Sequence, residues 1–143
     1  MKILIDIGHP AHVHLFKNFV FEMRKKGHKV LFTCIDREFI LYLLNLYNFD
    51  YYNLGKHYKS ILGKVLGLVK KELKMLLISL KFRPDLFLSH QSAAAAFTSF
   101  LLNKPHISFE DTFNMEQVIL YLPFTDVVLT GDYPHPSLGK KEI

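Results

Sequence analysis

Three histidines follow the first apolar run of the sequence, and they are the side chains best suited to proton chemistry. Residues 2–7 are mostly apolar, and Gly8-His9-Pro10-Ala11-His12 comes directly after them. A histidine close to the N-terminus of a helix has a lowered pKa, so it stays neutral and can accept a proton from a hydroxyl nucleophile. His12 is our first candidate for this role, with His9 and His90 as alternatives. Helix capping or loop shaping is the competing structural interpretation.

A metal centre is not expected from these histidines. His12 and His14 are two positions apart, so on a helix they point about 200° away from each other. No matching carboxylate or cysteine spacing accompanies them, and Cys34 is the only cysteine of the chain. A single cysteine excludes an internal disulfide and a cysteine-based metal site. The sequence therefore predicts neither a metal ion nor another cofactor.

Further polar residues follow two later apolar runs. In open α/β sheets, ligands bind beyond the carboxyl ends of the strands, and this rule selects Ser89 and His90 after one run and Glu110 and Asp111 after another. Adjacent carboxylates diverge along a strand, so this pair does not predict glycoside hydrolysis. Either carboxylate can accept hydrogen bonds from substrate hydroxyls or orient a histidine, with an N-cap as the alternative. We predict a substrate-binding set of His9, Ser89, His90, Glu110 and Asp111.

The glycine-rich signatures of several enzyme classes are missing. No G-x-G-x-x-G follows the first apolar run, and neither G-x-x-x-x-G-K-[ST] nor G-x-S-x-G occurs in the chain. These patterns position phosphate groups or a nucleophilic serine. Classical dinucleotide binding, P-loop chemistry and an α/β-hydrolase mechanism are therefore disfavoured.

The elements that must position the candidate residues alternate along the chain. Apolar runs predict six strands, at residues 2–7, 29–35, 51–54, 85–89, 106–109 and 126–130. Helical spacing predicts helices at residues 13–23, 38–47, 59–82 and 92–102, and a short one before the last strand. Such alternation predicts an α/β, Rossmann-like three-layer sandwich with a mostly parallel sheet. His28 and His106 fall at the opposite strand ends from the candidates, where we expect structural roles.

The composition is that of one compact domain. The 143 residues are 50% hydrophobic and 22% charged, and a chain of this length buries roughly 68–70% of the surface exposed when unfolded. Residues 86–103 form the longest stretch without a charged side chain, but the polar residues 89–92 lie inside it, so a membrane span is not predicted. Asp6 interrupts the first apolar run, so we expect no signal peptide there. Together with the single cysteine, this favours a cytoplasmic location.

The net charge of +5 comes from one predicted helix. Residues 56–83 hold eight basic residues against Glu72 alone, while the rest of the chain carries ten basic and twelve acidic residues. Nucleic-acid binding is therefore not expected. In this helix, an apolar stripe is expected to pack on the sheet: Leu62, Val65, Leu66, Val69, Leu73, Leu76, Leu77 and Leu80. The opposite side carries Lys64, Lys71 and Lys74 among apolar residues. This suits a peripheral contact with the inner face of a membrane or with a partner protein, and an ordinary basic surface is the alternative.

Two parts of the sequence resemble known families. Residues 1–16, MKILIDIGHPAHVHLF, and residues 24–30, RKKGHKV, resemble archaeal and bacterial proteins grouped as a domain of unknown function, whose members look like glycosyltransferases of the GT-B fold. Residues 81–90, KFRPDLFLSH, and 103–111, NKPHISFED, are similar to the acceptor-side half of the lipid-linked N-acetylglucosaminyltransferase of cell-wall synthesis. The resemblance implies that residues 1–143 form the N-terminal, acceptor-side domain, one half of a GT-B architecture, with the C-terminal donor domain absent.

The resemblance also implies roles and partners. His12 would match the first-loop histidine that acts as catalytic base or orients the acceptor in several inverting GT-B enzymes. Ser89, His90, Glu110 and Asp111 would match acceptor-side loops. The implied reaction transfers a sugar from a nucleotide-sugar, held by a second domain or a separate chain, to a hydroxyl of a sugar or lipid-linked acceptor, without a metal. Two alternatives stay open: a nucleotide-sugar epimerase of the same fold, and a non-catalytic adaptor that brings a catalytic subunit to a membrane.

Overall fold

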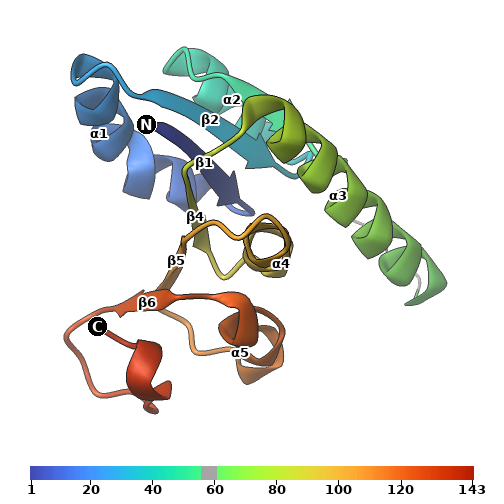
Figure 1. Ribbon diagram of the computed structural model, residues 1–143, viewed down its shortest axis with the longest axis vertical. Helices are drawn as coiled ribbons and strands as arrows, with labels where there is room; N and C mark the ends of the chain where they lie inside the picture. The colour runs from blue at the N-terminus through green and yellow to red at the C-terminus, as the bar shows by residue number, and fades with distance from the viewer. Residues whose placement is uncertain (56–60) are drawn as a thin grey trace.

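One sheet of short, apolar strands forms the centre of the molecule (Figure 1), in a computed structural model that describes residues 1–55 and 61–143. The strand order is β3-β2-β1-β4-β5-β6, and every neighbouring pair is parallel. The strands are β1 (Lys2–Ile7), β2 (Lys29–Cys34), β3 (Tyr51–Asn53), β4 (Leu86–His90), β5 (His106–Glu110) and β6 (Val127–Thr130). This arrangement confirms the predicted α/β, Rossmann-like fold with a parallel sheet.

Helices connect the strands, as crossovers between parallel strands require. They are α1 (Pro10–Lys25), α2 (Glu38–Leu46), α3 (Ile61–Phe82), α4 (Ala93–Leu101) and α5 (Met115–Tyr121), with 3₁₀ turns at Leu122–Phe124 and Gly139–Lys141. The helix α1 begins three residues before its predicted start. His9 caps it, and Pro10 occupies the first turn, where a missing backbone N–H costs nothing.

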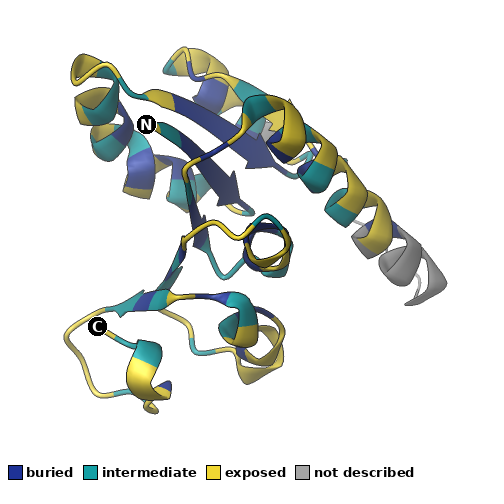
Figure 2. Cartoon of the chain, viewed as in Figure 1, coloured by how far each residue is buried: buried dark blue, intermediate teal, exposed yellow. Residues whose placement is uncertain are grey.

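Alternate side chains of the central strand β1 face opposite sides of the sheet. Side chains alternate along a strand, and Ile3, Ile5 and Ile7 share a buried cluster with residues of α1 and α2. Leu4 belongs to a second cluster with residues of α3, β4 and α4. The sheet therefore has helices on both faces, and its central strands β1 and β2 are almost entirely buried (Figure 2). Asp6 follows Leu4 on the α3 side.

The buried side of α3 differs from the predicted one. The structure exposes four residues of the stripe that was expected to pack on the sheet: Val69, Leu73, Leu77 and Leu80. Met75 and Ser79 are buried instead, and Met75 packs in the cluster with Leu4. The prediction was wrong because α3 is apolar on both sides, so hydrophobic spacing alone could not identify the side that faces the sheet.

The lysines of α3 also separate. Lys74 is exposed, whereas Lys71 is half-buried and lines a cleft at the end of the sheet. The side chain of Lys64 lies outside the described residues. Among the parts of the chain that the structure describes, no helix combines the length and the apolar character needed to cross a bilayer.

The strand order fixes where a ligand site can form. From β1 the chain turns toward β2, and from β4 it turns toward β5, so the connections after these neighbouring strands diverge. Divergence leaves a crevice beyond the carboxyl ends of the two strands, which is the usual ligand site of open α/β sheets. In this chain, the crevice lies between the segments that follow Ile7 and His90.

Candidate functional site

A cleft of about 570 Å³ occupies this crevice. The loop after β1 and the first turn of α1 contribute Gly8, His9 and His12, and the end of β4 with the turn after it contributes His90, Gln91 and Ser92. Further lining residues come from β1, α2, α3 and the β5–α5 loop: Asp6, Arg37, Lys71, Asp111 and Thr112. Residues from both halves of the sequence therefore meet at one place, as the strand order requires.

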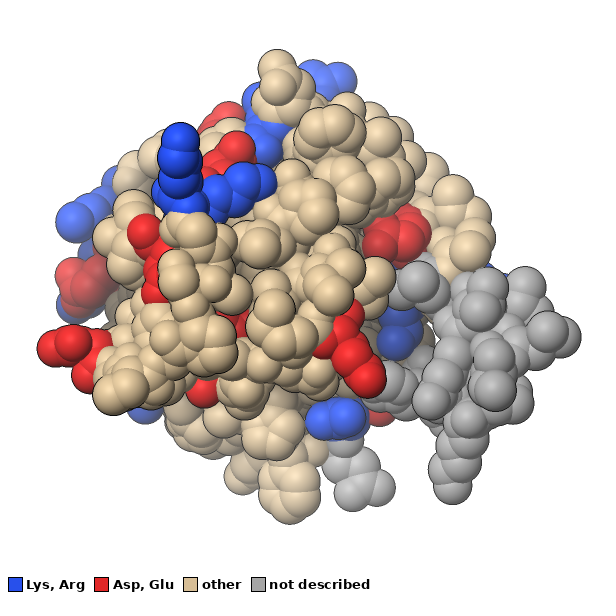
Figure 3. All heavy atoms as spheres, turned by 90° about the horizontal axis from the view of Figure 1, so that it is seen from below, with Lys and Arg blue, Asp and Glu red and all other residues tan. Residues whose placement is uncertain are grey.

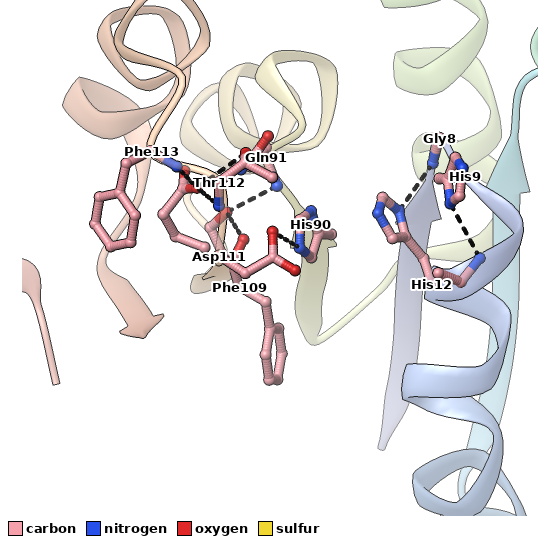
Figure 4. A network of polar contacts seen from close by, with 12 residues as sticks. Gly8, His9, His12, His90, Gln91, Phe109, Asp111, Thr112 and Phe113 are labelled. Atoms are coloured by element: carbon pink, nitrogen blue, oxygen red, sulfur yellow. Dashed lines mark hydrogen bonds and ion pairs between the residues drawn. The ribbon is translucent and has the colours of Figure 1, made fainter. Parts of the chain in front are cut away.

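Two histidines stack against each other in the cleft. The rings of His12 and His90 have centroids 4.1 Å apart and an interplanar angle of 23°. On the other side of His90, its Nε2 lies 3.1 Å from Oδ1 of Asp111. Figure 4 shows the His90 ring between the Asp111 carboxylate and the His12 ring. The structure thus brings together His12, His90 and Asp111, which the sequence analysis selected separately.

His12 is held as a neutral ring. Its Nδ1 accepts a hydrogen bond from the Gly8 backbone N–H at 3.3 Å. Burial lowers the pKa of His12 from 6.5 to about 3, and the neighbouring rings of His90 and His9 add to this effect. The pKa of His12 is thus lowered mainly by burial, whereas the helix N-terminus was the cause expected from the sequence.

The other two histidines of the first loop have different surroundings. His9 is exposed at the rim of the cleft, and its Nδ1 accepts the backbone N–H of Ala11 at 3.2 Å as the N-cap of α1. His14 is exposed and makes an edge contact with Tyr47, away from the cleft. Within residues 1–55 and 61–143, no group of three His, Cys, Asp or Glu residues is arranged to hold a metal ion.

Asp6 is a cleft residue that the sequence analysis did not select. One carboxylate oxygen accepts the Thr33 hydroxyl and the other accepts the Ser92 hydroxyl, each at 2.6 Å. Ser92 in turn caps α4 by accepting the Ala95 N–H. Burial raises the pKa of Asp6 from 3.8 to about 6, although both hydroxyl contacts oppose the rise. The sequence did contain a signal for Asp6: it is the one acidic residue within the apolar first strand, and a buried carboxylate needs hydrogen-bonding or charged partners.

Cations border the same cleft. Lys71 of α3 and Arg37, the N-cap of α2, both line it. Burial lowers the pKa of the Lys71 ammonium, while the nearby Asp6 carboxylate opposes this shift. The cleft therefore combines hydrogen-bond donors, acceptors and charges of both signs, which suits a polar ligand with several hydroxyl groups.

Glu110 lies beneath the cleft and organises the loop above it. Its Oε1 accepts the backbone N–H groups of Thr112 and Phe113 and the side-chain amide of Gln91. Its Oε2 accepts the Tyr121 hydroxyl. Glu110 is thus buried and does not line the cleft, but it holds the β5–α5 loop from which Asp111 extends.

Gln91 joins this loop to the turn after β4. Its backbone has φ 55°, a left-handed conformation that is uncommon for residues other than glycine. Its backbone N–H donates to Ser108, and its side-chain amide donates to Thr112. Such strained residues persist where the surrounding structure fixes them, and they gather at functional sites.

Ser89 is fully buried and is directed away from the cleft. Its hydroxyl contacts Nε2 of His106 at 2.9 Å, and Nδ1 of His106 contacts the Thr125 hydroxyl at 2.9 Å. Thr125 donates to the Tyr121 carbonyl, so it accepts from Nδ1–H of His106, and Nε2 then accepts the Ser89 hydroxyl. Burial lowers the pKa of His106 from 6.5 to about 4. The expected structural role of His106 is confirmed by this network.

Comparison with known proteins places the chain in a family and in a fold. The model of the family described as "Protein of unknown function (DUF354)" matches residues 1–133. An uncharacterized protein of Methanocaldococcus jannaschii is 25% identical over 130 residues, which are 90% of this chain and 38% of that protein.

Solved structures of similar fold include glycosyltransferases and UDP-GlcNAc 2-epimerases. Acinetobacter baumannii MurG matches with a TM-score of 0.78 at 11% identity, over all of this chain and 45% of MurG. The spinosyn rhamnosyltransferase SpnG, complexed with thymidine diphosphate, matches with a TM-score of 0.68 at 12% identity, over 96% of this chain and 49% of SpnG. The UDP-GlcNAc 2-epimerase of Neisseria meningitidis, bound to UDP-GlcNAc, matches with a TM-score of 0.71 at 18% identity, over 91% of this chain and 40% of the epimerase. The chain spans less than half the length of these relatives.

Proposed function

We propose a function for this chain, which belongs to the DUF354 family: it is the acceptor-binding half of a glycosyltransferase. The complete enzyme transfers a sugar from a nucleotide-sugar to a hydroxyl group of the acceptor. The observation that carries this proposal is the stacked pair His12 and His90, with Asp111 beside it, in a polar cleft at the end of β1 and β4. A neutral imidazole is a suitable base for a hydroxyl nucleophile.

The polar lining of the cleft supports a hydroxyl-rich acceptor. His9, Gln91 and Thr112 offer donors and acceptors at its edge, and Lys71 and Arg37 add positive charge. Of the residues predicted to bind substrate, His9, His90 and Asp111 line the cleft, while Ser89 and Glu110 support it from below. We assign acceptor contact to the lining residues and loop positioning to the two buried ones.

A second domain or a separate chain supplies the nucleotide-sugar in this proposal. This chain covers 45% of MurG and 49% of SpnG, so both of those proteins are about twice as long as the chain. The donor diphosphate is then held outside this chain, for example at a helix N-terminus of the second domain. The reacting centre lies where the two halves face each other.

The exposed side of α3 supports a peripheral contact with a membrane that carries a lipid-linked acceptor. Exposed apolar residues of α3 are Val69, Leu73, Leu77 and Leu80, and the exposed lysines Lys70, Lys74 and Lys81 lie beside them. Apolar side chains with neighbouring cations fit an anionic lipid surface.

Further apolar residues are exposed on α4 and α5: Phe97, Phe100, Leu101, Ile119 and Leu120. Figure 3 shows a broad uncharged area with scattered acidic side chains on the face seen from below. Lys71 was among the lysines expected from the sequence to contact a membrane, but we leave it out of this surface because it lines the cleft.

A transfer assay tests the proposal. This chain is supplied with its donor half, either as one polypeptide or as a separately produced chain, and is incubated with UDP- and dTDP-linked sugars and hydroxyl acceptors. We expect release of the nucleoside diphosphate only when an acceptor is present, together with a glycosylated acceptor in the mass spectrum. His14→Gln is the matched control, because His14 lies outside the cleft, and it keeps full activity.

Two results would overturn the proposal. One is the absence of transfer with every donor and acceptor pair. The other is conversion of a nucleotide-sugar into its isomer without any acceptor. That result would favour the epimerase alternative, since the Neisseria meningitidis epimerase has a similar fold.

A further inference from the structure

The stacked histidines are not equivalent, because hydrogen bonds fix the proton of each ring at a defined nitrogen. A carboxylate can only accept hydrogen bonds, so Nε2 of His90 carries the proton that faces Oδ1 of Asp111. In the neutral ring, the lone pair of His90 is then on Nδ1. The sequence itself could not assign these positions, since Asp111 lies 21 positions after His90.

The contacts of His12 have the opposite effect. Its Nδ1 accepts the Gly8 N–H, so the lone pair of His12 is already used and the proton of the neutral ring is on Nε2. Protonation of His12 would place a second N–H against the Gly8 N–H and would break this hydrogen bond. The pKa of His12, lowered to about 3 mainly by burial, agrees with a ring that resists protonation.

We propose that His90, oriented by Asp111, is the base that takes the proton of the acceptor hydroxyl, and that His12 binds the same acceptor through its Nε2–H. This inference rests on the proposed glycosyl transfer and moves the role of base from His12 to His90. Asp111 is a positioning residue: it fixes the tautomer of His90 and stabilises the imidazolium that forms.

The step balances in atoms and charge. The O–H bond of the acceptor breaks, and its proton goes to Nδ1 of His90, which becomes an imidazolium paired with Asp111. The acceptor oxygen uses its electron pair to form a bond to the anomeric carbon of the nucleotide-sugar. The bond between that carbon and the diphosphate oxygen breaks, and the nucleoside diphosphate leaves with the bonding pair.

A spectroscopic test on this chain needs no enzymatic activity. Side-chain ¹⁵N NMR of histidine distinguishes the protonated from the unprotonated ring nitrogen. In the neutral ring of His90 we expect an unprotonated Nδ1 and a protonated Nε2, and we expect His12 to remain neutral when the pH is lowered to 4. Asp111→Asn removes the fixed acceptor, so neutral His90 becomes a mixture of tautomers. A neutral His90 ring that carries its proton on Nδ1 in the wild-type chain would overturn the proposal.

Kinetics of the complete protein provide the second test. His90→Gln lowers kcat by about 10²- to 10⁴-fold, the usual contribution of a general base. His12→Gln keeps an N–H donor and acts mainly on KM for the acceptor, with less than about a tenfold loss of kcat. A larger kcat loss for His12→Gln than for His90→Gln would return the base to His12.

These two tests also separate this inference from the proposed function. If the wild-type protein transfers no sugar, the transferase proposal fails, but the ¹⁵N spectra still decide the tautomers. If transfer occurs and His90→Gln keeps the wild-type kcat, the proposed function stands and the assignment of the base fails.

Discussion

At the scale of single residues, the cleft depends on a carboxylate that does not reach it. Glu110 is buried and satisfies two backbone N–H groups of the β5–α5 loop, while the Tyr121 hydroxyl binds its second oxygen. The same contact raises the pKa of Tyr121, after the larger effect of burial. The position of Asp111 therefore rests on contacts made one layer below the cleft.

Removal of the Tyr121 hydroxyl tests this support. Tyr121→Phe keeps the ring but leaves Oε2 of Glu110 without its donor, and a buried acceptor that loses its partner costs about 1–3 kcal/mol. We expect a loss of this size in the free energy of unfolding, measured by urea denaturation. Tyr133→Phe is the matched control: its hydroxyl donates to the Asp111 carbonyl from an exposed position. Equal losses in both variants would contradict the importance of the buried contact.

The sequence predicted some site residues and not others for physical reasons. His12, His90 and Asp111 were accessible to prediction because each follows an apolar run, and the carboxyl ends of parallel strands meet at one edge. The same rule could not separate cleft residues from supporting ones, because a position at the end of a strand does not show whether the side chain is buried, as those of Ser89 and Glu110 are. Asp6 was missed because its partners, Thr33 and Ser92, come from distant parts of the chain.

At the scale of elements, α3 shows where hydrophobic patterning stops being informative. The existence of the helix and its end before Pro84 were predictable, because proline cannot continue a helix. The orientation of the helix was not, because apolar residues lie on two sides. Its contact with α4, where Met75 packs against the cluster that holds Ala95, decides which side is buried.

The exposed stripe of α3 gives a prediction at the same scale. We expect this chain to sediment with vesicles that contain anionic lipid and to bind less as the salt concentration rises. The double variant Leu73→Glu/Leu77→Glu abolishes binding with little effect on folding, because both side chains are exposed. Lys26→Glu, which changes an exposed lysine just after α1, is the control and binds nearly as wild type. Equal binding by the wild type and the double variant would exclude α3 as the contact.

At the scale of the whole molecule, two buried titratable groups respond to pH in opposite directions. Asp6 lies near the carboxyl end of β1, and His106 begins β5. Burial raises the pKa of Asp6 from 3.8 to about 6 and lowers the pKa of His106 from 6.5 to about 4. The folded chain therefore binds the Asp6 proton more tightly than the unfolded chain and binds the His106 proton less tightly.

These shifts predict opposing slopes of stability between pH 7 and pH 5. The raised pKa of Asp6 adds about 1 kcal/mol to the free energy of unfolding as the pH falls, because the folded state takes up the proton first. The lowered pKa of His106 removes about 2 kcal/mol over the same interval, because the unfolded state takes up its proton first. Urea denaturation at pH 5, 6 and 7 measures both effects. Relative to the wild type, Asp6→Asn falls more steeply on acidification and His106→Gln falls less. Lys26→Gln, which does not titrate in this range, follows the wild-type slope, and parallel slopes for all four chains would show that neither buried group is coupled to folding.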